Sequence, residues 1–182
     1  MSRALLIIDI QNDYFVGGAY PLVGSEAAAE AASRAVAAFR ASDDPVIHVQ
    51  HVWDAPDALF MRPGTRGIEI HDAVRPLPDE IVLQKAEPNA FLGTGLGERL
   101  AAIAPDELVV VGMMTSMCVD STVRAAAERG FAVRVLHDAC AAPDLEFGGA
   151  AVAGAAVHTA FIAALADGFA EVSAVDDYLA AG

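Results

Sequence analysis

Cysteines, basic residues and long apolar runs are scarce in this sequence, and each scarcity excludes a class of protein. It contains only two cysteines, Cys118 and Cys140, and their spacing matches neither a metal site nor a disulfide framework, so we expect a reducing, cytoplasmic setting. Its 11 lysines and arginines are outnumbered by 25 aspartates and glutamates. The resulting net charge of −14 disfavours nucleic acid and anionic membrane surfaces as partners. No stretch approaches the roughly 20 apolar residues of a membrane span.

What is present is typical of a globular protein. Hydrophobic residues make up 55% of the 182 residues and charged residues 20%, which argues against disorder. The length predicts a single domain over residues 1–182. The first three residues lead directly into a short apolar segment that is too brief for a signal peptide with its cleavage site.

The apolar pattern alternates between short β-branched runs and alanine-rich helical stretches. We expect strands at residues 4–8, 46–49, 81–83, 108–111, 131–136 and 170–175. We expect helices at 27–41, with Ser25 as the N-cap, at 97–104, from about 118 to Gly130, and at 150–166. This order predicts an α/β fold with a six-stranded, mostly parallel, doubly wound (Rossmann-like) sheet between helices. Residues 50–78 are irregular, and a loop of that length is usually functional.

The stretch from Glu107 to Gly130 is the centre of this pattern. It begins as a strand buried on both faces and continues as a helix, with Cys118 in the first helical turn. Active sites of open α/β sheets lie at this carboxyl edge, and the unpaired N–H groups and dipole of a helix start lower a thiol pKa and stabilise an oxyanion. The alternative is that Cys118 is simply a small buried core residue.

Two further reactive side chains occupy equivalent positions. Asp9 and Lys85 each stand at or just past the carboxyl end of an expected strand, as Cys118 does. A lone aspartate there is more often a turn residue, and a lone lysine is usually solvated. Together, however, the carboxylate can take the thiol proton while the ammonium holds the carboxylate and stabilises the thiolate.

Three motifs in this order make the sequence recognisable: LIIDIQNDYF at 6–15, Lys85 shortly before Asn89-Ala90-Phe91, and GMMTSMCV at 112–119. Together they resemble the isochorismatase-like cysteine hydrolase superfamily, which includes nicotinamidases and carbamoylsarcosine amidase. The resemblance implies a six-stranded parallel sheet, with Cys118 as nucleophile, Asp9 as acid/base and Lys85 as third triad member. It also implies a cis peptide between Met113 and Met114, an oxyanion hole made by the Met114 and Cys118 amides, and a homodimer or homotetramer.

One departure from the family pattern concerns a metal. Nicotinamidases hold a metal through an aspartate and histidines after the second strand, whereas this chain has Gln50 where the aspartate is expected. His51 remains to face the pocket, and strand alternation then points His48 away from it. We therefore expect no metal and no other cofactor, because the ligand set is incomplete.

The predicted function is a cysteine-dependent amidohydrolase that cleaves a small amide, lactam or ureide through a thioester. The alternatives are a zinc-dependent nicotinamidase, a thiol-redox protein using both cysteines, and a non-catalytic dimerisation module. The expected substrate contacts are Gln11, Phe15, His51, Trp53, Phe60, Met113 and Phe147. Most of them are large apolar residues, and the competing interpretation is that such residues form core or subunit contacts.

Overall fold

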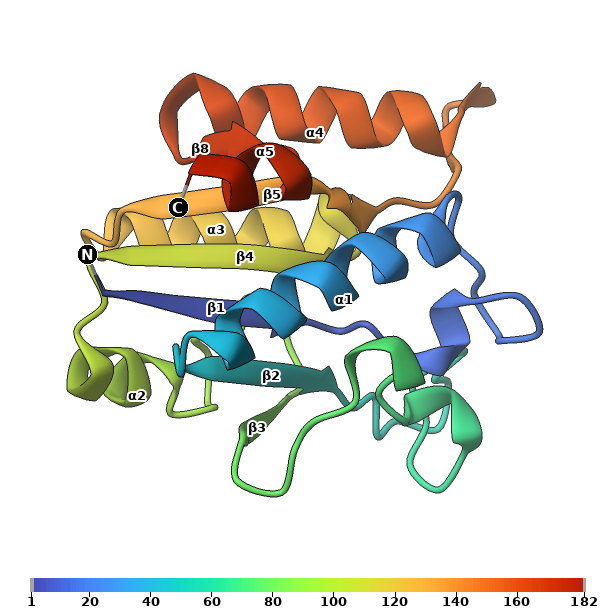
Figure 1. Cartoon of the computed structure of the whole chain (residues 1–182). Helices are drawn as coiled ribbons and strands as arrows, with labels where there is room; N and C mark the ends of the chain where they lie inside the picture. The colour runs from blue at the N-terminus through green and yellow to red at the C-terminus, as the bar shows by residue number, and fades with distance from the viewer. Residues whose placement is uncertain (1, 182) are drawn as a thin grey trace.

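The computed structural model describes residues 2–181 and confirms the doubly wound α/β fold (Figure 1). Six strands form one parallel sheet in the order β3-β2-β1-β4-β5-β8. Because the chain winds outward from β1 in one direction and from β4 in the other, the strand order reverses between these two neighbours. Such a reversal opens a crevice at the carboxyl ends of the strands. The strands are β1 (Arg3–Ile8), β2 (Val46–His51), β3 (Ile81–Lys85), β4 (Glu107–Met113), β5 (Val133–Ala141) and β8 (Glu171–Ser173).

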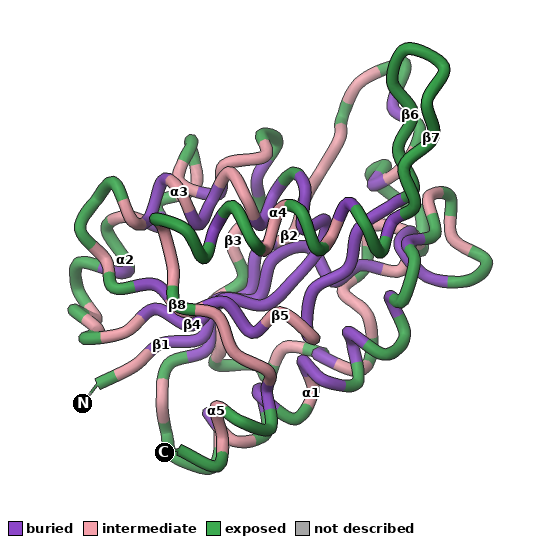
Figure 2. Tube along the Cα trace, turned by 90° about the horizontal axis from the view of Figure 1, so that it is seen from above, coloured by how far each residue is buried: buried purple, intermediate pink, exposed green. Residues whose placement is uncertain are grey.

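Helices cover both faces of the sheet (Figures 1 and 2). Helices α1 (Ser25–Ala41) and α5 (Val175–Ala181) pack on one face, and α2 (Leu96–Ile103), α3 (Asp120–Glu128) and α4 (Gly154–Gly168) on the other. Successive residues of β1 alternate between the two cores: Leu5 and Ile7 belong to the first, Leu6 and Ile8 to the second. Among the described residues, no helix is both long and apolar enough to cross a membrane.

The expected helix at 150–166 begins later than predicted. Residues Leu145–Phe147 (β6) and Ala150–Val152 (β7) form a small antiparallel hairpin, and α4 starts only at Gly154. Gly148 and Gly149 make the turn with φ of 61° and 80°, which glycine adopts without a Cβ penalty. The alanine-rich composition predicts a helix from 150, but the paired glycines set a turn and residues 150–152 pair as a strand instead. Figure 2 shows this hairpin projecting from the body with its residues exposed.

Two smaller expectations are also corrected. Ser25 does not cap α1, because Gly24 holds the cap position with φ of 77° and the Ser25 hydroxyl donates to the Leu22 carbonyl. The last strand, β8, is shorter than the expected 170–175. Helix α5 already begins at Val175 and continues through a segment that the sequence left unassigned. Neither change affects the order of the sheet strands.

Gly112 keeps β1 and β4 close at the reversal point. It pairs with Ile8 and has φ of 145°, and a Cβ at this position would lie 2.2 Å from the Ile8 carbonyl oxygen. Only glycine therefore fits between the two strands whose ends carry the reactive groups.

Candidate active site

Asp9, Lys85 and Cys118 meet at the carboxyl edge of the sheet. Asp9 follows β1, Lys85 is the last residue of β3, and Cys118 lies just after β4. All three are buried. The Lys85 ammonium lies 2.6 Å from Asp9 Oδ2 and 3.1 Å from Cys118 Sγ. The structure thus brings together a carboxylate, an ammonium and a thiol in one contact network.

The segment that carries Cys118 differs from the expected helix start. Residues Thr115–Val119 form a single π-helical turn, and α3 begins only at Asp120. The Met113–Met114 peptide that precedes this turn is cis. The Met114 carbonyl accepts hydrogen bonds from the N–H groups of Met117 and Val119, at 3.1 and 3.2 Å. These bonds tie the cysteine turn directly to the end of β4.

The pKa of the Cys118 thiol is shifted upward, whereas its position at a helix start predicts a downward shift. Burial, and then the charge of Asp9, raise the pKa of Cys118 well above its ordinary value, and Lys85 opposes them only in part. Burial also raises the pKa of Asp9, against the nearby charge of Lys85. For Lys85, burial lowers the pKa, but the charges of Asp9 and Cys118 outweigh it and the net shift is upward. Cys118 therefore rests as a thiol beside an ammonium.

A cavity of about 230 Å³ opens above Cys118. It is smaller than the roughly 300–1,000 Å³ of pockets for drug-sized ligands, so it suits a small molecule. Its walls are mainly apolar and aromatic. They consist of Tyr14, His51, Trp53, Phe60, Ala86, Pro88, Met114 and Met117, with Cys118 itself.

A family model described as the isochorismatase domain matches residues 3–177, nearly the whole chain. The chain belongs to the isochorismatase family. The isochorismatase-family protein YddQ of Bacillus subtilis, which is uncharacterised, is 45% identical over 98% of this chain and 99% of its own length. A crystal structure from Oleispira antarctica, assigned to the isochorismatase hydrolases, is 44% identical, covers 98% of this chain and 96% of that one, and has a TM-score of 0.94. The ureidoacrylate amidohydrolase RutB of Methylorubrum extorquens is 32% identical over 76% of this chain and 69% of its own.

Within this isochorismatase-family fold, the expected substrate contacts divide into two groups. His51, Trp53 and Phe60 line the cavity, and Trp53 and Phe60 meet edge to face with ring centroids 5.3 Å apart. The sequence did not mark Tyr14, Ala86, Pro88 or Met117 as wall residues. Tyr14 and Met117 lie inside the recognised motifs at 6–15 and 112–119, which were the available signal. Ala86 and Pro88 come from a loop whose course sequence reasoning does not supply.

The remaining four expected contacts do not line the cavity and are corrected here. Gln11 is fully buried, and its amide is engaged by backbone groups. Phe15 is buried against His71, with ring centroids 3.8 Å apart. Met113 belongs to the core on the α1 side, and Phe147 stands on the β6–β7 hairpin with 91% of its surface exposed. The position of these four residues in the sequence does not show which way their side chains point.

The residues present do not fit a nicotinamidase-type metal set. The Gln50 amide donates to the Ile68 carbonyl and accepts from Gln84, so it is not directed at the cavity. His48 points away, as expected, and lies 2.9 Å from Glu80. Only His51 remains. It forms a cluster of possible ligands with Asp9 and Cys118, whose ligand atoms all lie within 4.8 Å of one another, and the Lys85 ammonium contacts all three.

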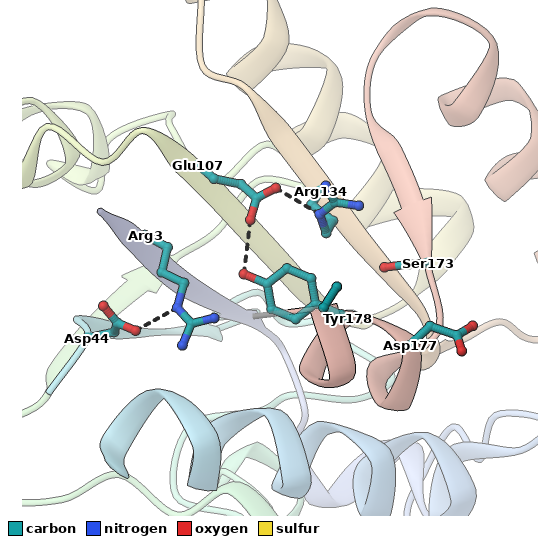
Figure 3. A pocket seen from close by; sticks show the side chains of 8 residues that line it. Arg3, Asp44, Glu107, Arg134, Ser173, Asp177 and Tyr178 are labelled. Carbon is teal, nitrogen blue, oxygen red and sulfur yellow. Dashed lines mark hydrogen bonds and ion pairs between the residues drawn. The ribbon is translucent and has the colours of Figure 1, made fainter. Parts of the chain in front are cut away.

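A larger cavity, of about 600 Å³, lies at the opposite edge of the sheet (Figure 3). Four of its charged side chains form two pairs: Arg3 with Asp44 at 2.6 Å, and Arg134 with Glu107 at 2.7 Å. The Tyr178 hydroxyl donates to the other Glu107 oxygen at 2.9 Å. Neither cysteine lines this cavity.

Proposed function

We propose that this isochorismatase-family hydrolase cleaves the carbon–nitrogen bond of a small amide, lactam or ureide through a thioester on Cys118. The observation that carries the proposal is the Lys85 ammonium, which contacts both Asp9 and Cys118, while Cys118 also lines the small cavity. An acid/base group and a nucleophile sharing one cation are the parts that acyl transfer needs.

In the first stage, Asp9 takes the thiol proton of Cys118. The raised pKa of the thiol makes this transfer unfavourable at rest, while the raised pKa of Asp9 makes that carboxylate a better base than a solvated one. The ammonium of Lys85 stays protonated beside the new thiolate and offsets part of the cost. The thiolate then forms a bond to the carbonyl carbon, and the N–H groups of Met114 and Cys118 donate to the oxyanion.

In the second stage, the carbon–nitrogen bond breaks and the departing amine takes the proton from Asp9. The acyl group remains on Cys118 as a thioester. Asp9, again a carboxylate, removes a proton from water, the hydroxide adds to the thioester carbon, and Cys118 leaves as a thiolate that regains the proton from Asp9. One water is consumed, and the products are an acid and an amine or ammonia.

The test is an ammonia-release screen over small amides, lactams and ureides with the purified wild-type protein and a Cys118→Ala control. Turnover in the wild type and none in the control is the expected result. A protein that reacts equally well without the Cys118 sulfur would refute the thioester route. Covalent adducts on Cys118, caught by mass spectrometry after a rapid acid quench, would identify the intermediate directly.

We also propose that the protein works as a homodimer or homotetramer, in a reducing compartment that suits its two free thiols. The outer face of α4 is uncharged from 153 to 166, in a chain of net charge −14 that otherwise repels its copies. The β6–β7 hairpin, which directly precedes α4, is exposed (Figure 2). Its residue Phe147 exposes 91% of its surface. An uncharged helix face together with an exposed aromatic ring favours a partner of the same kind.

Light scattering tests this surface. Ala160→Glu places a charge on the exposed face of α4 and should yield monomers, whereas Ala37→Glu, on an exposed position of α1, should not. A wild-type protein that is already monomeric, or an Ala160→Glu variant that keeps its oligomeric mass, would contradict the assignment.

A further inference from the structure

The Lys85 ammonium has a third partner besides Asp9 and Cys118. Its Nζ lies 2.8 Å from His51 Nδ1. An ammonium has three N–H donors, and here the three acceptors are a carboxylate oxygen, a thiol sulfur and an imidazole nitrogen. The side chain is therefore held from three directions, and His51 supplies the one contact that is not part of the proposed triad.

This contact fixes the protonation of the His51 ring. An imidazole nitrogen that accepts from an ammonium carries no proton, so in the neutral ring the proton sits on Nε2. Burial, and then the charge of Lys85, lower the pKa of His51 to about 4, which keeps the ring neutral at neutral pH. Within the described part of the chain, no side chain or backbone group hydrogen-bonds to Nε2. His51 lines the cavity, so this N–H is available to a bound molecule.

The backbone of His51 is fixed as firmly as its ring. The Gln11 side chain accepts from the His51 N–H at 2.8 Å and donates to the His51 carbonyl at 2.9 Å. On the neighbouring strand, Lys85 is the register partner of His51, so their side chains leave the sheet on the same face. Gln11, expected from sequence to touch substrate, instead sets the position of His51.

We propose that His51 has two roles in the reaction. Its Nδ1 holds the Lys85 ammonium between Asp9 and Cys118, and its Nε2–H donates a hydrogen bond to an acceptor on the substrate. The substrate class is then a small amide that carries a second carbonyl or similar acceptor near the scissile group, as ureides do. The second role rests on the proposed amidohydrolase function, whereas the first is a property of the resting site and is tested without turnover.

Two substitutions separate these roles. His51→Asn places an amide oxygen near the position of Nδ1 and removes the Nε2–H, while His51→Gln reaches the position of Nε2 and leaves that of Nδ1 empty. His137→Asn is the matched control, because His137 does not line the cavity. Circular dichroism and thermal unfolding establish that all three variants are folded before any rate is compared.

The first measurement is the rate at which iodoacetamide alkylates Cys118 at pH 7.5, which follows the availability of the thiolate. We expect His51→Gln to slow alkylation about tenfold, as the loss of one hydrogen bond to a charged group would. His51→Asn and His137→Asn should stay within about twofold of wild type. Equal rates for the Gln and Asn variants, or a slower Asn variant, would overturn the role of Nδ1.

The second measurement is protection of Cys118 from iodoacetamide by acetylurea and by pentanamide, which have the same number of heavy atoms but differ in the second carbonyl. Wild type should be protected at about tenfold lower concentrations of acetylurea, and His51→Asn should lose this preference while His51→Gln keeps most of it. No preference in wild type, or an unchanged one in His51→Asn, would overturn the role of Nε2–H. If neither amide releases ammonia, the amidohydrolase proposal fails for these compounds, and the alkylation and protection results still decide the roles of His51.

Discussion

Replacing Lys85 by methionine tests how far one buried cation supports both the fold and the chemistry. Methionine fills a similar unbranched volume but carries no charge. The side chains of Lys85 and Asp9 are completely shielded from solvent, and their charged atoms are 2.6 Å apart. Removing one partner of a buried ion pair typically costs about 3–5 kcal/mol, because the other charge is left uncompensated. That is a large share of the roughly 5–15 kcal/mol by which most domains are stable.

The loss should depend on pH in a defined direction. Burial already raises the pKa of Asp9, and removing Lys85 takes away the largest of the effects that oppose this shift, leaving only the hydrogen bonds from Cys118 and from the His51 backbone. Between about pH 4, the unfolded value, and its raised folded pKa, Asp9 is more fully protonated in the folded variant than in the unfolded chain. The stability of the variant therefore falls as pH rises through this window. Lys85 itself has a raised pKa, so the stability it adds in wild type is fully present below about 10.5 and does not vary between pH 5 and 8. The deficit of Lys85→Met should therefore be largest near pH 8 and smaller at pH 5.

Urea unfolding at pH 5 and pH 8 measures this, with the double variant Asp9→Asn/Lys85→Met as the control that removes both charges. We expect the double variant to be more stable than Lys85→Met at pH 8 by about 2 kcal/mol or more, and the difference to shrink at pH 5. In single-turnover assays, Lys85→Met should lose most of its thioester formation, because its Asp9 is protonated and cannot accept the thiol proton. Equal stability of the single and double variants at pH 8, together with wild-type acylation by Lys85→Met, would refute the reasoning.

Three further predictions concern the two thiols, the metal and the acid range. Cys118 should react with iodoacetamide at least about tenfold faster than Cys140, since Cys118 borders a cavity and a cation whereas Cys140 is buried and does not line that cavity. Mass spectrometry after brief labelling would show equal labelling or the reverse order if the assignment is wrong. Overnight chelation should leave activity within about twofold, because no metal-activated water is needed; stoichiometric zinc in elemental analysis, with activity lost on chelation, would revive the nicotinamidase interpretation. Burial alone would raise the pKa of Glu80, but hydrogen bonds to Arg40 and His48 lower it to about 2. The ionised Glu80 therefore stabilises the fold above about pH 4.5, and this stabilisation is lost as pH falls towards 2. Glu80→Gln should unfold about 1–3 kcal/mol more easily at pH 7 and lose this acid dependence in urea titrations, and an unchanged acid limb would contradict it.

The sequence by itself determined the order of the elements and the edge of the sheet at which the reactive groups stand. Buried β-branched runs such as Leu108–Val111 have few alternatives to a parallel strand, and the carboxyl ends of such strands must lie together. That reasoning requires no side-chain geometry, and it was enough to place Asp9, Lys85 and Cys118 near one another. The motifs around them were equally local, which is why they pointed to the isochorismatase family.

Only the tertiary structure decided the pKa shifts and the side-chain contacts, because these depend on distances between atoms and on the exclusion of water. Position at a helix start predicted a lowered pKa for Cys118, but burial beside Asp9 raises it, and burial is a property of the packed chain. Gln11 is among the substrate contacts expected from the sequence, yet its amide is occupied by the backbone of His51, from a strand some 40 positions later. His51 in turn meets Lys85 only because β2 and β3 pair in register. Contacts between segments distant in sequence arise from packing, and no local pattern encodes them.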